Sequence, residues 1–296
     1  MRLDDEQESG NYEIQRGGGG GGFGFGGGGG GGLGMLFGLV GSRFGCGGIV
    51  VLVVIMMVLG MNPLSMLGGG SGVVAPSTQT AAPGDASQLT EAQRLSLRVL
   101  GSTERRWGDI YAQRGERYQP TTLVFYDRNG QSGCGAAQSA MGPFYCPADN
   151  KVYLDTSFFD ELSTRFGAPG DFAQAYVIAH EVGHHIQTLD GTSARVRAAQ
   201  QRAGEAESNA LQVRMELQAD CYAGVWAARD QNLLEPGDVE EGLRAAQAIG
   251  DDTLQREAQG RVVPESFTHG TSAQRQQWLK RGLDTGDPAQ CDTFAG

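Results

Sequence analysis

The pattern of apolar and polar residues predicts a largely helical domain with a small sheet in the C-terminal two thirds of the chain. Two short runs of β-branched and aromatic residues, Thr121–Tyr126 and Lys151–Asp155, are bounded by turn residues and predict strands. The run FAQAYVIAHEVGHHIQTL from Phe172 predicts a strong helix, with Asp171 available as its N-cap. Helices are also predicted over Thr90–Gln113, as one or two pieces, and over Ala194–Ala203, Glu205–Arg229, Val239–Ile249 and Ser272–Arg281. A small sheet followed by helices indicates an α+β fold.

The N-terminal third contains a long apolar run. Residues 44–67 carry no charge, and Ile49–Leu59 is unbroken apolar sequence, so the run reaches the roughly 20 residues that cross a bilayer. A cleaved signal peptide is the alternative, but its n-region would be far too long. Arg2, Arg16 and Arg43 precede the run and the next basic residue is Arg94, so the positive-inside rule predicts a cytoplasmic N-terminus.

These patterns divide the chain into four parts. We expect a cytoplasmic, glycine-rich disordered segment over 1–43, a single transmembrane anchor over 44–67, a flexible linker over 68–86, and an extracytoplasmic domain over 87–296. The predicted location is therefore a membrane, with the domain on its extracytoplasmic side.

Composition narrows the possible functions. The 296 residues hold 23 Lys and Arg against 34 Asp and Glu, which gives a formal charge of −11. Bulk charge of this sign excludes a nucleic-acid binder that relies on a basic footprint. Most of the 48 glycines lie before position 73, so the domain that follows has an ordinary composition and enough length for a real core.

Four cysteines follow the apolar run, an even number in a compartment where disulfides persist. Three pairings are possible. Cys134 and Cys146 flank a short loop and most simply close it, which leaves Cys221 to join Cys291. A four-cysteine zinc site is the alternative, but no two of these cysteines have the C-x-x-C spacing.

The strongest chemical signal is the motif HEVGHH at 180–185, which holds three of the four histidines. His180 and His184 are four residues apart on a predicted helix, so both imidazoles lie on one face and can bind one zinc ion. Glu181 sits next to His180, where it can reach a water at the metal without being a ligand, as a general base requires.

A second pair of residues completes the predicted site. Glu216 and Asp220 are also four apart, on a later helix whose neighbouring residues are apolar. A carboxylate pair directed into a core needs a partner. We therefore expect Glu216 to be the third ligand and Asp220 to accept the N–H of a ligating histidine. Asp190 is the rival third ligand, but the turn glycine that such a position requires is Gln187 here.

The other two histidines have less defined roles. His185 points away from the face of His180 and His184, so we expect a packing or surface residue. His269 precedes a predicted helix and is either a loop residue bonded to a neighbour or a donor that stabilises the oxyanion of a tetrahedral intermediate.

Several of these stretches resemble one family, the bacterial putative neutral zinc metallopeptidases of the YpfJ-like group. The resemblance is carried by SGCG and GPFYCP around Cys134 and Cys146, VYLDTSFFDEL from Val152, GDFAQAYVIAHEVGHHIQ from Gly170, ELQADCYAGVW from Glu216, AIGDDTLQ from Ala248, SFTHGTSAQR from Ser266, and CDTF from Cys291. It implies a zincin-like metallopeptidase domain of the gluzincin kind. His180, His184 and Glu216 would be the ligands, Glu181 the base, and Asp220 the partner of the first histidine.

The sequence thus predicts a zinc metalloendopeptidase that binds one Zn²⁺ per chain and hydrolyses peptide or protein substrates. It would be anchored in the bacterial cytoplasmic membrane, with its catalytic domain periplasmic or extracellular. Glu181 would act as general base, and His269 would help to hold the oxyanion. The loop closed by Cys134 and Cys146 is the candidate cleft wall, where an extended peptide could add along a strand edge. The alternative is a catalytically silent envelope binding protein that keeps a structural zinc.

Overall fold

The computed structural model describes residues 1–3, 5–15, 86–230 and 232–295, which belong to one compact unit. The predicted transmembrane anchor, nearly all of the linker and residues 16–43 lie outside the described residues. No helix within the described ranges is long and apolar enough to cross a bilayer.

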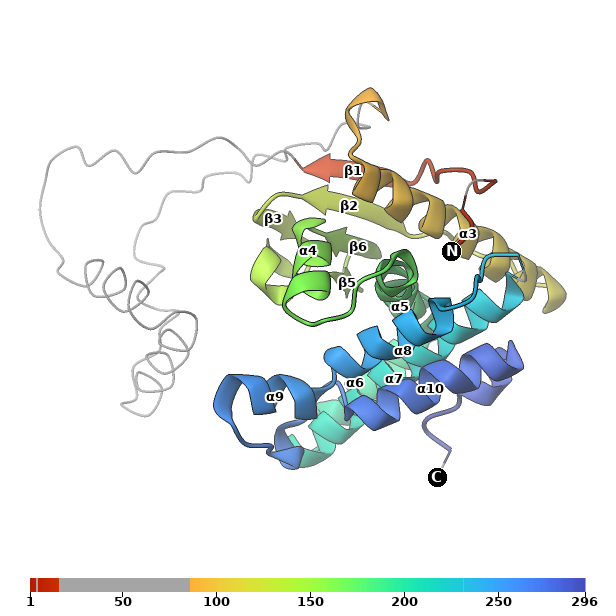
Figure 1. Ribbon diagram of the computed structural model, residues 1–296. Helices are drawn as coiled ribbons and strands as arrows, with labels where there is room; N and C mark the ends of the chain where they lie inside the picture. Colours follow the sequence, from red (N-terminus) through yellow and green to blue (C-terminus); the bar gives the residue numbers. More distant parts are fainter. Residues whose placement is uncertain (4, 16–85, 231, 296) are drawn as a thin grey trace, which may run out of the picture. The chain divides into compact units, whose positions relative to one another are not determined.

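The sheet part consists of a four-stranded sheet in the order β1-β2-β6-β5 and a separate β-hairpin (Figure 1). β1 and β2 are parallel, as are β2 and β6, whereas β5 runs antiparallel to β6 and forms one edge. The strands are β1 (Tyr12–Gln15), β2 (Thr122–Tyr126), β3 (Asn129–Ser132), β4 (Gly135–Gln138), β5 (Phe144–Cys146) and β6 (Lys151–Leu154). The two strands predicted from sequence are β2 and β6, and the strand β1 was not predicted.

The helices contribute most of the core. They are α3 (Glu91–Gln113), α4 (Ser157–Thr164), α5 (Asp171–Leu189), α6 (Thr192–Gln200), α7 (Glu205–Arg229), α8 (Asp238–Ala248), α9 (Asp251–Gln259) and α10 (Ser272–Thr285). The large buried side chains include Trp107, Phe125, Phe172 and Trp226, which join the sheet, α3, α5 and α7 in one hydrophobic cluster. The α+β class is therefore confirmed.

Helix α5 lies at the centre of this unit, between the sheet and the α7, α8 and α10 helices (Figure 1). Fourteen of its 19 residues are buried, as expected for a helix that is apolar on nearly all sides. Its first residue is Asp171, and the preceding cap position is Gly170, whose φ of 125° lies in a region that favours glycine. The predicted N-cap is thus displaced by one residue.

Residues 1–15 correct the expected domain boundary. The sequence analysis placed 1–43 in a disordered cytoplasmic segment, but residues 12–15 form β1 and Leu3 is 4% exposed within the core. The expectation was wrong for residues 1–15 because a four-residue strand with only one aliphatic side chain carries almost no sequence signal. Its order comes from pairing with β2.

Both disulfides pair as the cysteine spacing suggested. Cys134 bonds Cys146, and Cys221 bonds Cys291. The first closes the segment that contains the β4 strand and β5, and the second ties the C-terminal segment to α7. The alternative four-cysteine zinc site is thereby excluded, because none of these thiols is free.

Candidate active site

Helix α5 presents three functional side chains to one cleft. His180 and His184 stand one turn apart, with ring centroids separated by 4.8 Å and rings nearly perpendicular. Glu181 lies beside them and is 7% exposed, and all three side chains line the same cleft. The spacing predicted from sequence therefore places two imidazoles and a carboxylate around one small volume.

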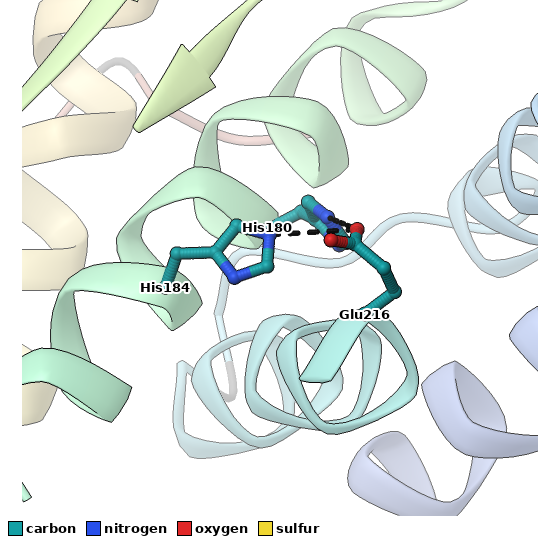
Figure 2. A group of neighbouring side chains, drawn as sticks. All are labelled: His180, His184 and Glu216. Atoms are coloured by element: carbon teal, nitrogen blue, oxygen red, sulfur yellow. Dashed lines mark hydrogen bonds and ion pairs between the residues drawn. The ribbon is translucent and has the colours of Figure 1, made fainter. Parts of the chain in front are cut away.

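Glu216 reaches the two histidines from α7, as Figure 2 shows. Its Oε2 lies 3.1 Å from Nε2 of His180 and 3.5 Å from Nε2 of His184. The three candidate ligand atoms lie within 4.8 Å of one another. Ligands that sit about 2.0–2.1 Å from a tetrahedral zinc are about 3.3 Å apart, so the observed separations fit such an ion.

The charges of the site also favour a cation. Burial opposes protonation of His180, but the Asp220 and Glu216 carboxylates outweigh it and raise its pKa to about 10. Burial raises the pKa of Glu216, but the neighbouring His184 and His180 hold it well below its usual range. The site thus stabilises positive charge between these side chains, which is what a divalent metal would supply.

Asp220 fixes the orientation of His180. Its Oδ1 lies 2.8 Å from Nδ1 of His180, and a carboxylate can only accept, so Nδ1 carries the proton and Nε2 is left free to bind a metal. Asp220 is itself held by Arg275, which donates to both carboxylate oxygens at 2.8 and 2.9 Å, and by the Tyr176 hydroxyl at 2.6 Å. Burial opposes ionisation of Asp220, but Arg275 above all lowers its pKa to about 2.

Two glutamines bond to the other two candidate ligands, His184 and Glu216, and sequence reasoning had not identified either glutamine as a support. Gln187 accepts from Nδ1 of His184 at 2.9 Å and donates to the backbone of Met215 at 2.7 Å. Gln212 donates to the second oxygen of Glu216 at 2.8 Å. Gln187 stands where a turn glycine would be needed for Asp190 to be the third ligand. It instead connects α5 to α7 beside His184.

Close helix contacts set the distance between these groups. A Cβ on Gly183 would meet the Cα and carbonyl oxygen of Ala219 at 3.0 Å, so α5 and α7 approach closely between the two pairs of functional residues. A Cβ on Gly224 would meet the carbonyl of Leu279 at 2.2 Å, and α7 and α10 are equally close there. The glycines thus determine how near Glu216 and Arg275 come to α5.

Glu181 has the environment of a general base. Burial raises the pKa of its carboxyl group, while the two histidines and a backbone hydrogen bond from Tyr145 act in the opposite direction, and the net shift is upward. A carboxylate with a raised pKa accepts a proton more readily than a solvated one. Its carboxylate is not among the ligand atoms of His180, His184 and Glu216 that lie within 4.8 Å of one another.

His269 lines the same cleft from the loop before α10. Its Nδ1 lies 3.2 Å from Oδ1 of Asp251, and the other oxygen of Asp251 accepts backbone N–H groups of Thr268, His269 and Gly270. The Asp251 hydrogen bond raises the pKa of His269, so the ring is more readily a charged donor. Sequence reasoning missed Asp251 because nothing in the spacing of 251 and 269 indicates a contact.

The two remaining candidates lie elsewhere. His185 is 2% exposed, places Nε2 2.7 Å from the carbonyl of Gln119 and packs against Tyr118, so it is a packing residue. Asp190, the rival third ligand, accepts from the Tyr111 hydroxyl at 2.7 Å and is not in the group around His180. It is the C-cap residue of α5.

The cleft has a volume of about 600 Å³, and apolar side chains line one part of it while polar and charged side chains line another. Apolar side chains line one part, among them Phe158 and Phe166, whose ring centroids are 6.5 Å apart, and Val177, one turn before His180. Arg197 and Gln200 from α6 line another part, beyond the C-terminal end of α5. The loop closed by the first disulfide also lines the cleft, as the sequence analysis expected.

The site defines a class of protein, one with a helix-borne HExxH motif, a carboxylate from a later helix as the third candidate ligand, and an adjacent open cleft. The chain belongs to the family described as putative neutral zinc metallopeptidase, which it matches over residues 1–294.

The chain is also similar to curated proteins. The uncharacterized protein YpfJ of Escherichia coli K12 is 52% identical over 254 residues, which cover 84% of this chain and 87% of that protein. The uncharacterized protein Rv2575 of Mycobacterium tuberculosis H37Rv is 47% identical over 190 residues, 60% of this chain and 63% of that protein. No solved structure matches the chain.

Proposed function

We propose that the protein is a zinc-dependent metalloendopeptidase with a zincin-like catalytic domain and one Zn²⁺ per chain. The observation that supports this most directly is the convergence of His180, His184 and Glu216 beside Glu181 in an open cleft. A structural zinc site is closed by four protein ligands, whereas a catalytic one has three and keeps a position open. The family assignment supports the zinc and the hydrolase chemistry.

The chain's own residues would divide the work as follows. Zinc, when bound, would polarise the scissile carbonyl and make water more acidic. Glu181 would take a proton from the attacking water and deliver it to the leaving nitrogen. His269, oriented by Asp251, would donate a hydrogen bond to the carbonyl oxygen as negative charge develops there.

The neighbouring sheet would orient the substrate. β5 is an edge strand that pairs with β6, and Phe144 and Tyr145 from it line the cleft. An extended peptide could add to its open edge through backbone hydrogen bonds, which recognise a polypeptide without reading its sequence. This arrangement supports an internal peptide bond as the substrate.

The test uses the full chain, since residues 1–15 are part of the fold. Zinc content and cleavage of casein and a peptide library would be measured on wild type, Glu181→Gln and Glu216→Ala. We expect one zinc and cleavage in wild type, zinc without cleavage in Glu181→Gln, and loss of both in Glu216→Ala.

Asp190→Asn is the matched control, because it changes the rival ligand while keeping a hydrogen-bond acceptor for Tyr111. It should retain zinc and activity. Zinc in wild type with no cleavage of any substrate would favour the silent binding protein instead, and a wild type without zinc would refute the proposal altogether.

A further inference from the structure

The N-terminal segment, residues 1–15, contributes the strand β1 to the sheet that also holds β2, β6 and β5. β1 pairs in parallel with β2 over four residues, from Tyr12 opposite Leu123 to Gln15 opposite Tyr126. The backbone carbonyl of Asn11 extends the pairing by accepting the N–H of Leu123 at 2.9 Å. Figure 1 shows β1 lying beside β2, next to α3.

Side chains reinforce this attachment along the whole segment. Glu8 pairs with Arg94 at 3.1 Å, and Glu13 pairs with Lys151 at 2.7 Å. Leu3 is buried in the core. The segment thus has an apolar anchor and ion pairs to two different elements, α3 and β6.

Helix α3 is shaped to receive the segment. A Cβ on Gly101 would meet the carbonyl oxygen of Gln7 at 2.3 Å and the backbone nitrogen of Ser9 at 3.3 Å. Ser9 in turn donates its backbone N–H to the carbonyl of Leu97 at 2.9 Å and its hydroxyl to Glu104 at 2.7 Å. The region predicted as one or two helices is one continuous helix, and Gly101 within it leaves space for this backbone.

We propose that residues 1–15 and 86–295 lie on the same side of the bacterial membrane, and that this is the oxidising side. A single crossing of the membrane between these two parts of the chain is therefore excluded. Paired strands are about 4.8 Å apart, whereas the hydrocarbon core of a bilayer is about 30 Å thick. β1 therefore cannot pair with β2 across a membrane. The two disulfides of the domain assign the shared side to the oxidising compartment.

This inference replaces the expected cytoplasmic N-terminus and does not depend on the proposed hydrolysis. Arg2 was one of the basic residues to which the positive-inside rule was applied. In the folded domain its Nε lies 3.1 Å from the Glu235 carboxylate, so its charge is paired.

Cysteine labelling of the full chain in bacterial cells would test the arrangement. Gly10→Cys and Gly204→Cys, each with Cys46→Ser, place single free thiols at exposed positions where a Cβ meets nothing within 4 Å. A membrane-impermeant maleimide should label both in intact spheroplasts as fully as after lysis. Labelling of Gly10→Cys only after lysis would overturn the proposal, and labelling of both only after lysis would overturn the assignment to the oxidising side.

A second measurement tests whether the segment is docked in the membrane-bound protein. Ser9 is 5% exposed, so the thiol of Ser9→Cys should react slowly. Gly101→Ala should raise that rate at least tenfold by displacing the backbone of Gln7, whereas Gly108→Ala on the same helix, where a Cβ meets nothing within 4 Å, should leave it unchanged. Equal rates in the two variants would contradict the docking of residues 1–15.

Discussion

Gly183→Ala is expected to weaken zinc binding, although Gly183 is not itself a candidate ligand. The new Cβ would lie 3.0 Å from the Cα and the carbonyl oxygen of Ala219, where ordinary contacts begin at 3.4 Å. Backbone atoms cannot rotate away, so α5 and α7 must separate by about 0.4 Å at the contact. Metal–ligand distances tolerate about 0.2 Å, so Glu216 would no longer meet both histidines.

We expect a loss of about 10- to 100-fold in zinc affinity, equivalent to about 1.4–2.8 kcal/mol. The measurement is zinc affinity by competition with a chromogenic chelator, alongside thermal unfolding of the metal-free protein. Alanine also favours the helix over glycine by roughly 0.5–1 kcal/mol, so the metal-free protein should lose little stability.

Gly108→Ala controls for the change in helix propensity and should keep wild-type zinc affinity. The Cβ of Ala219 is a third close atom, 3.2 Å from the new Cβ. Adding Ala219→Gly to Gly183→Ala removes that atom and should restore part of the affinity. Wild-type zinc affinity in Gly183→Ala would refute the claim that this helix contact sets the ligand geometry.

Three other predictions follow from the site. Asp251 stabilises the charged form of His269, so Asp251→Asn should lower the pKa of His269. The alkaline limb of the kcat/KM profile should then move to lower pH, and an unmoved limb would argue against a charged His269 as donor. Arg275→Met leaves the buried carboxylate of Asp220 without its main counter-charge, so the free energy of unfolding in urea should fall by about 3–5 kcal/mol. The loss should be smaller when Asp220→Asn is added, and a loss below about 1 kcal/mol in Arg275→Met would contradict this reasoning. Phe158→Ala should reduce kcat/KM roughly tenfold for peptides with a bulky apolar residue near the scissile bond, measured against small-residue peptides, and equal effects on both would exclude Phe158 from specificity.

The sequence predicted those elements whose signal is local. The strong helix from Phe172, the long helix ending at Arg229 and the two β-branched strands all appear, because their apolar periodicity is set by burial within one element. The strand β1 and the short strand β5 did not give such a signal. Their order depends on pairing with distant residues, which composition does not reveal.

The candidate site shows the same division. Spacing of i, i+4 alone predicted that His180 and His184 share one helix face and that Glu216 and Asp220 share another. That Glu216 faces the two histidines was inferred from its apolar neighbours and from the family resemblance. Arg275 and Asp251 could not be assigned, because each acts through a contact made only when separate helices pack. A buried arginine is the clearest of these tertiary features, and burial is not readable from a polar sequence context.

The pairing of β1 with β2 also bears on how the chain folds. β1 is synthesised first, yet its partner lies more than one hundred residues later, so closing that loop costs about 4 kcal/mol of chain entropy. Contacts of such sequence separation form slowly. Until β1 pairs with β2, the backbone groups of β2 that face β1 have no partner. Together with the side chains of Leu123 and Phe125 they form an apolar strand edge that another chain can bind. Newly made copies would therefore be most prone to aggregation before β1 has paired, and the pairing of β1 would remove that risk.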